Sequence, residues 1–126
     1  MRLINFFVSK LRVLFRYFYQ YLNKKNFENN FKNSGCYLGF NTRFFKPEKI
    51  KLGNNLFIGD NVFINCGKGG TVTVGDNTSL AQGVKILSWY KESLPSFPDN
   101  IIAKDVVIGK CCRIGYDAII MPGVTI

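Results

Sequence analysis

The stretch from Val107 to Ile126 carries the pattern that decides the fold. It contains Val107-Ile108-Gly109, then Arg113-Ile114-Gly115, then Ile120-Met121-Pro122-Gly123-Val124-Thr125-Ile126. Aliphatic residues therefore recur every six positions, and glycine follows two of them. The same spacing occurs earlier in the chain, at Leu52, Ile58 and Ile64, at Val74, Leu80 and Ile86, and more weakly at Leu38 and Phe44. A short internal repeat of this kind predicts stacked, repeated structural units.

Each hexad predicts one short strand followed by one corner. The aliphatic residue points inward, where it stacks on its counterpart in the next unit, and β-branched residues favour strands. Gly, Asn and Asp tolerate the left-handed backbone of a tight corner, and Asn54-Asn55, Asp60-Asn61 and Asp76-Asn77 lie where corners are expected. Three hexads would make one coil, and coils would stack about 4.8 Å apart. Several coils are needed because one coil alone buries little.

Two interruptions break the repeat. The spacing from Ile64 to Val74 is ten, which predicts a small extra loop over Cys66–Thr71. A longer interruption separates Ile86 from Ile108 and predicts a loop from Ser88 to about Asn100. Its bulky and cyclic residues are Trp89, Tyr90, Pro95, Phe97 and Pro98. Repeat proteins place such insertions on one face, which is often the binding face.

The N-terminal region has a different, helical pattern. One face combines apolar residues at spacings of three and four, namely Ile4, Phe7, Leu11, Leu14, Phe15, Phe18 and Leu22. The opposite face carries Arg2, Asn5, Ser9, Arg12, Arg16, Gln20 and Asn23. We therefore expect a basic amphipathic helix over 1–25, a polar linker over 26–35 and the repeat domain over 36–126. The helix would either lie in a membrane interface through residues 2–23 or pack on its own β-domain or on another subunit.

Composition narrows the function classes. The chain of 126 residues has 17 basic and 8 acidic residues, a formal charge of +9, and no histidine. The absence of histidine removes the commonest general base and metal ligand. Charge alone suggests nucleic acid, and no binding motif supports that partner. Lys10, Arg12 and Arg16 interrupt the apolar N-terminal stretch, so neither a secretory signal nor a spanning helix is expected. We expect a cytoplasmic protein, either free or peripheral on the inner face of the plasma membrane, with reduced cysteines at Cys36, Cys66, Cys111 and Cys112.

From about Pro47 to Ile126, the hexads and the two loops resemble the hexapeptide-repeat acyltransferases, particularly sugar and polysaccharide O-acetyltransferases of the maltose, galactoside and colanic-acid type. The resemblance implies an all-β fold, a left-handed parallel β-helix, preceded here by the amphipathic helix. It also implies a homotrimer, with acetyl-CoA or another acyl-CoA as co-substrate and no metal. A sugar or lipid-linked sugar hydroxyl would attack the thioester in a groove between subunits, assisted by a histidine base.

This chain departs from the family at that base. The family's histidine position falls within Trp89, Tyr90 and Lys91, none of which is histidine. Tyrosine and lysine are ordinarily protonated at neutral pH, and Glu92 would be a weak substitute unless it were buried. Loss of a general base typically costs about 10²–10⁴-fold in rate, so binding would survive better than turnover.

The resemblance also implies contacts on other corners and strands. Asn61 matches an asparagine that helps to form the acceptor pocket, although an ordinary corner asparagine is the competing interpretation. Arg113 would meet a phosphate of CoA or would be a solvated outward side chain. Gly115 and Tyr116 fall where the backbone follows the pantetheine arm, and Tyr116 is bulkier than the usual residue there.

The repeat stops at Ile126, where the family continues with a further coil and a cap. We expect a truncated or interrupted reading frame, or a short variant capped by a partner or by its own helix. Two functions remain open: an acyl-CoA-dependent O-acyltransferase, or an inactive β-helix that serves as a trimeric binding or structural module. Gamma-class carbonic anhydrases require three histidines on zinc, so that chemistry is excluded.

Overall fold

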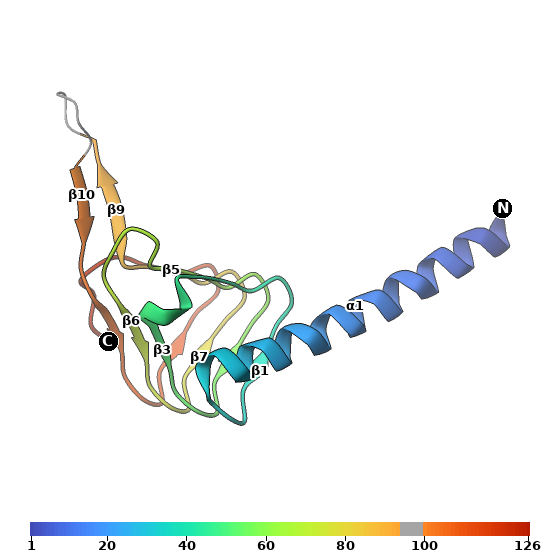
Figure 1. The fold of residues 1–126 in the computed structure, drawn as a ribbon, viewed down its shortest axis with the longest axis horizontal. Helices are drawn as coiled ribbons and strands as arrows, with labels where there is room; N and C mark the ends of the chain where they lie inside the picture. The colour runs from blue at the N-terminus through green and yellow to red at the C-terminus, as the bar shows by residue number, and fades with distance from the viewer. Residues whose placement is uncertain (94–99) are drawn as a thin grey trace. The chain divides into compact units, whose positions relative to one another are not determined.

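A computed structural model describes residues 1–93 and 100–126 (Figure 1). The chain divides into two compact units, Met1–Lys32 and Asn33–Ile126. The first unit is a helix, and the second contains all the strands. Each unit is described separately below.

The first unit is the helix α1 (Arg2–Phe31). It ends at Lys32, which adopts a left-handed conformation and donates its backbone N–H to the carbonyl of Glu28 at 2.9 Å. The expected linker over 26–35 is therefore helical as far as Phe31. Neither Gly nor Pro occurs before Gly35, and the rings of Phe27 and Phe31, one turn apart, lie 5.0 Å from each other. Among the described residues, no helix has the length and apolar character needed to cross a bilayer.

The second unit is built from three parallel sheets of short strands. The β1 sheet contains, in order, β1 (Tyr37–Leu38), β4 (Phe57–Ile58), β7 (Ser79–Leu80) and β12 (Arg113–Ile114). The β2 sheet contains β2 (Arg43–Phe45), β5 (Phe63–Asn65), β8 (Lys85–Leu87) and β13 (Ile119–Ile120). The β3 sheet contains β3 (Ile50–Leu52), β6 (Val72–Val74) and β11 (Val106–Ile108). A 3₁₀ turn, η1 (Pro47–Lys49), precedes β3, and an antiparallel pair joins β9 (Trp89–Glu92) to β10 (Asn100–Ala103).

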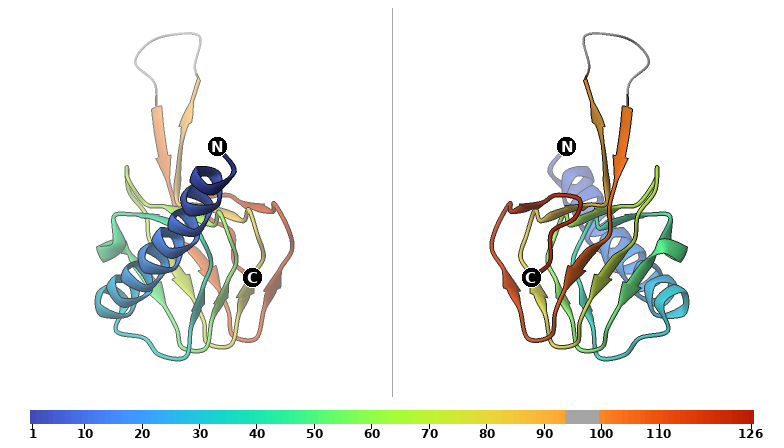
Figure 2. Two further views of the ribbon diagram at one scale, coloured as in Figure 1. Left: turned by 90° about the vertical axis from the view of Figure 1, so that its right-hand side faces the viewer. Right: turned by 90° about the vertical axis from the view of Figure 1, so that its left-hand side faces the viewer.

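The chain visits the three parallel sheets in a fixed order, one strand in each, and then returns to the first. Hexad residues are direct partners across neighbouring strands, as in Leu38 with Ile58, Ile58 with Leu80, and Leu80 with Ile114. The stacked strands are visible in both views of Figure 2. The six-residue spacing therefore sets the register within each sheet.

The predicted fold class, an all-β left-handed parallel β-helix preceded by an N-terminal amphipathic helix, is wrong, although the N-terminal helix itself is present. The structure combines a 30-residue helix with short parallel sheets and one antiparallel pair, and it does not show a clear left-handed β-helix. The hexad pattern reports strand spacing and inward positions. A separate helical pattern predicted the N-terminal helix, which extends farther than expected, and the antiparallel pair forms within the interruption of the repeat.

The core of the second unit contains the hexad residues and a second inward row. Leu52, Ile58, Ile64, Val74, Leu80, Ile86, Ile108 and Ile114 are all buried, whereas Ile120 is half-buried and Ile126 exposed. The second row lies two positions earlier and includes Ile50, Leu56, Val62, Val72, Val84 and Val106. This follows from strand geometry, in which alternate residues share a face. Thr78 belongs to the second row, and its hydroxyl donates to the carbonyl of Gly109 at 2.9 Å.

Left-handed residues form the corners between the β1 and β2 sheets. Asn41, Asn61, Gly83 and Asp117 all have positive φ and follow one another in successive passes of the chain. At Gly83 an added Cβ would collide with the present position of the Asp117 carboxylate, so a larger residue there would require that side chain to move. The expected corner at Asn61 is therefore present.

The two ends of the expected loop from Ser88 to about Asn100 are the paired strands β9 and β10 of a β-hairpin. In its register, Trp89 is opposite Ala103 and Glu92 is opposite Asn100. The hairpin extends away from the three parallel sheets (Figures 1 and 2). The predicted loop residues Pro95, Phe97 and Pro98 lie outside the described residues.

Candidate functional site

The candidate site is the place where the β9–β10 hairpin leaves the parallel sheets. We call this place the hairpin base and define it as Asn65, the Cys66–Thr71 loop, Ser88 and Trp89. The short loop and the hairpin are the two interruptions of the hexad repeat, and they meet here. The carbonyl of Ser88 accepts the N–H of Lys104 at 2.9 Å, which joins the two ends of the hairpin.

Asn65 holds the hairpin base together through one side-chain oxygen. Its Oδ1 accepts the backbone N–H of Gly67 at 2.8 Å and the indole N–H of Trp89 at 3.1 Å. A Cβ at Gly67 would lie 2.9 Å from the same oxygen, so a larger residue there would require the Asn65 side chain to shift. The half-buried Trp89 ring is thus held in one orientation by a group 24 positions earlier in the chain.

Ser88 and Cys66 form the buried layer beneath. The Ser88 hydroxyl donates to the carbonyl of Gly69 at 2.6 Å, and both Ser88 and Cys66 are fully buried. Burial raises the pKa of the Cys66 thiol, because the charged thiolate would lose its hydration. Nucleophilic cysteines need a stabilised thiolate, so Cys66 acts as a packed, neutral side chain.

The residues at the position of the family's histidine lie on β9. The indole N–H of Trp89 donates to Asn65 within the hairpin base, whereas Tyr90, Lys91 and Glu92 are exposed. Glu92 is the outermost residue of β9 and lacks the burial that would make it a useful substitute base. The hairpin base therefore offers an ordered aromatic and amide surface for binding, without a buried general base among its described residues.

Asn61 serves as a corner residue. Its φ of 57° is left-handed, its backbone N–H donates to the carbonyl of Phe40 at 2.8 Å, and its side-chain oxygen accepts from Asn41 Nδ2 at 2.9 Å. These bonds link it to the preceding pass of the chain. They account for an asparagine here without an acceptor pocket, which favours the structural interpretation.

The three expected CoA contacts lie on the last pass and are all exposed. Arg113 is on β12 opposite Ser79, and Tyr116 is 78% exposed. A Cβ at Gly115 would meet nothing within 4 Å, so the structure leaves open space there. Gly115 and Tyr116 precede Asp117, which stacks in the same corner column as Asn61.

The predicted site residues thus fall on two separate edges of the second unit. Asn61, Gly115 and Tyr116 lie near the corner that leads into the β2 sheet, whereas Trp89 to Glu92 lie beyond its other end. Five residues of extended chain, from Gly83 to Ser88, separate the two edges, a distance of about 16 Å. A site that used both edges would need a ligand of that length or two copies of the chain.

Sequence reasoning missed Asn65 and Ser88 as organising residues. Asn65 follows the hexad residue Ile64 just before the short loop, and Ser88 is the first residue of the long interruption. A polar residue where each break of the repeat begins was the available signal. The contacts of Asn65 and Ser88 with each other, and of Asn65 with Trp89, depend on the strand register, which cannot be predicted from the sequence alone.

No group of three or more His, Cys, Asp or Glu side chains arranged to hold a metal occurs within residues 1–93 and 100–126. Comparisons with protein-family models, with curated proteins and with solved structures find no match for this chain.

Proposed function

We propose that the chain is an acyl-CoA-dependent O-acyltransferase that acts on a hydroxyl of a sugar or polysaccharide precursor. The proposal rests on the residues that resemble the hexapeptide-repeat acyltransferases, above all the string from Val107 to Ile126. The observation that carries it furthest is the ordered hairpin base, which lies where that resemblance expects the acceptor hydroxyl to react. In that reaction the hydroxyl oxygen attacks the thioester carbonyl, the C–S bond breaks, and the CoA thiolate takes up a proton.

The hairpin base would position the acceptor sugar and would not accept the proton of its hydroxyl. The hydrogen bond to Asn65 orients the Trp89 ring before a ligand arrives. A sugar face could therefore pack on the ring without the entropic cost of ordering that side chain. The proton of the acceptor hydroxyl would pass to water or to the exposed carboxylate of Glu92. We therefore expect turnover slower than that of a histidine-assisted enzyme by about 10²–10⁴-fold.

A homotrimer would bring the two edges together. Within one chain the hairpin lies about 16 Å from the corner that carries Gly115 and Tyr116. A neighbouring copy that presents this corner to the hairpin would supply the CoA side of the groove, with Arg113 facing a phosphate. The cytoplasm is the compartment where acyl-CoA is available, which fits the expected localisation.

The test is acyl transfer by the purified full chain with acetyl-CoA and a panel of sugar acceptors. CoA release, followed by chromatography, should depend on one class of acceptor. Tyr90→His places an imidazole on the exposed face of β9, and turnover should rise on the order of 10²-fold. Tyr90→Phe is the matched control and should not raise turnover. Absence of both acetyl-CoA binding and turnover would refute the proposal.

A second candidate is a non-catalytic trimeric binding or structural module. It is favoured by two observations, the absence of histidine throughout the sequence and the exposed position of Glu92. Acyl-CoA or sugar binding without turnover, in both the natural chain and Tyr90→His, would select this candidate over the enzyme.

A further inference from the structure

The helix α1 exposes an unusually large apolar surface. Phe7, Leu11, Leu14 and Phe18, which follow one another along one face, are 59%, 63%, 65% and 61% exposed. Other large apolar residues around them are also exposed, including Leu3, Ile4, Phe15, Tyr17, Tyr21 and Leu22. Contiguous apolar surface of this extent marks an interaction site.

The apolar surface wraps around most of the helix. With 3.6 residues per turn, the polar residues from Arg2 to Asn23 that share one face fall within an arc of about 80°. The apolar arc, from Val13 round to Tyr19, covers about 240°. Helices that pack on a protein surface need an apolar stripe upwards of about 100° wide. If a helix with an arc twice that width packed on a protein, much of its apolar surface would stay exposed to water. Lipid can cover the whole arc.

The charge on α1 selects the kind of lipid. No acidic residue occurs before Glu28, while six basic residues precede it, namely Arg2, Lys10, Arg12, Arg16, Lys24 and Lys25. A second copy of the helix would bring like charges together, which opposes self-association. The second unit has ten basic and seven acidic residues, so it offers no opposite net charge either. Anionic headgroups supply the complementary charge.

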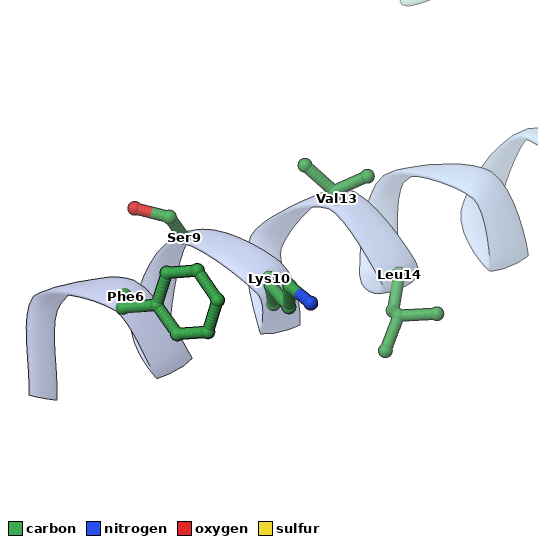
Figure 3. A pocket seen from close by; sticks show the side chains of 5 residues that line it. All are labelled: Phe6, Ser9, Lys10, Val13 and Leu14. Atoms are coloured by element: carbon green, nitrogen blue, oxygen red, sulfur yellow. The ribbon is translucent and has the colours of Figure 1, made fainter. Parts of the chain in front are cut away.

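Two lysines lie within the apolar arc, and their ammonium groups are close to aromatic rings. Lys10 Nζ lies 4.8 Å from the centre of the Phe6 ring, and Lys25 Nζ lies 5.5 Å from that of Tyr21. Each ammonium group lies over an aromatic ring, and the long lysine stem allows such a group to reach a polar layer from an apolar arc. Figure 3 shows Phe6 and Lys10 with Ser9, Val13 and Leu14 around a shallow hollow. All five side chains come from one helix, so the hollow is a surface notch rather than an enclosed ligand site.

We propose that α1 binds in the interface of a membrane rich in anionic lipid. The helix lies parallel to the bilayer plane, its apolar arc enters the boundary between headgroups and acyl chains, and Arg2, Arg12 and Arg16 face the headgroups. A helix of 30 residues is about 45 Å long, so the contact is extensive. The proposal is independent of acyl transfer and would place the second unit close to lipid-linked acceptors.

Vesicle flotation of the full chain tests the proposal. Two vesicle types are compared, pure phosphatidylcholine and phosphatidylcholine mixed with phosphatidylglycerol, at low and high salt. We expect binding to the mixed vesicles, weaker binding at high salt, and little binding to the neutral ones. Equal binding to both vesicle types, or no binding to either, would overturn the proposal, as would a salt-independent dimer in solution.

Matched variants separate the electrostatic contribution to membrane binding from the hydrophobic contribution. The double variant Arg2→Gln/Arg12→Gln should weaken binding to the mixed vesicles by about 30-fold, since each cation near an anionic surface contributes about fivefold. Lys51→Gln/Lys68→Gln removes the same charge from exposed positions of the second unit and should change binding less than about twofold. Phe7→Ser/Phe18→Ser should weaken binding by at least about 100-fold. Equal losses in the two charge variants, or full binding by the phenylalanine variant, would contradict the proposed geometry.

Discussion

The bond between Asn65 and Trp89 offers a quantitative test of the hairpin base. Asn65→Ala removes two hydrogen bonds, from Gly67 at 2.8 Å and from Trp89 at 3.1 Å. A typical intramolecular hydrogen bond contributes about 1 kcal/mol net, so the free energy of unfolding should fall by about 2 kcal/mol. Trp89→Phe removes one of these two bonds, together with some packing area, and leaves Gly67 bonded.

A double-mutant cycle isolates the shared bond. The packing loss at Trp89 cancels when Trp89→Phe is made in both the natural and the Asn65→Ala background, so the coupling free energy should be about 1 kcal/mol. Urea unfolding followed by circular dichroism measures all four proteins. Because Trp89 is the only tryptophan, its fluorescence should also shift to longer wavelength in Asn65→Ala, as the ring becomes more hydrated.

Asn54→Ala is the control for this experiment. Asn54 Oδ1 accepts the N–H of Ser34 at 3.0 Å, so the substitution removes a comparable bond far from Trp89. Its effect should add to that of Trp89→Phe, and the Trp89 emission should not move. Additive effects for Asn65→Ala and Trp89→Phe would refute the proposed role of Asn65.

Four further predictions test the core, the corners and the buried thiol. Ile58→Ala should lower the free energy of unfolding by about 2–5 kcal/mol, whereas Ile119→Ala, on an exposed position, should change it by about 0.5 kcal/mol or less; equal losses in urea unfolding would contradict the inward rows. At Asn61, Gly should be tolerated while Ala should cost about 1–2 kcal/mol, because φ is 57°; the reverse order of melting temperatures would rule out the left-handed corner. Cys111 should react quickly with iodoacetamide and the buried Cys66 slowly, as mass spectrometry would show. Since burial raises the pKa of Cys66, the folded state keeps its proton above the ordinary thiol pKa of about 8.5, where the unfolded state loses it, so stability should fall as pH rises above that value and Cys66→Ala should flatten the slope.

The sequence predicted the parts of the fold that follow from local periodicity. Six-residue spacing identified inward residues such as Ile58 and Leu80, and turn chemistry identified the corner at Asn61. The second inward row, for example Val62, was not predicted, because glycine marks the hexad residue that it follows and no such marker accompanies the residue two positions earlier. The N-terminal helix was predicted but runs farther than expected, to Phe31. The fold class was wrong because the hexads report strand spacing, which neither determines the handedness of the coil nor predicts the antiparallel pair within the interruption.

Less of the candidate site could be predicted. Trp89 and Tyr90 were identified as part of an insertion, and the structure places them on the hairpin. The contacts that order the hairpin come from Asn65 and Ser88, which approach Trp89 and the short loop only through the register of the β2 sheet. Single-sequence patterns report which residues share a face, whereas hydrogen bonds between separate interruptions depend on the folded geometry.

Detection of product tests the proposed function most directly. The purified chain and its Tyr90→His variant are incubated with acetyl-CoA and the sugar panel, and the sugars are analysed by mass spectrometry. We predict an O-acetylated sugar from both proteins, with more formed by Tyr90→His. Unmodified sugars from both proteins, under conditions where acetyl-CoA binds, would contradict acyl transfer and leave the chain as a binding module.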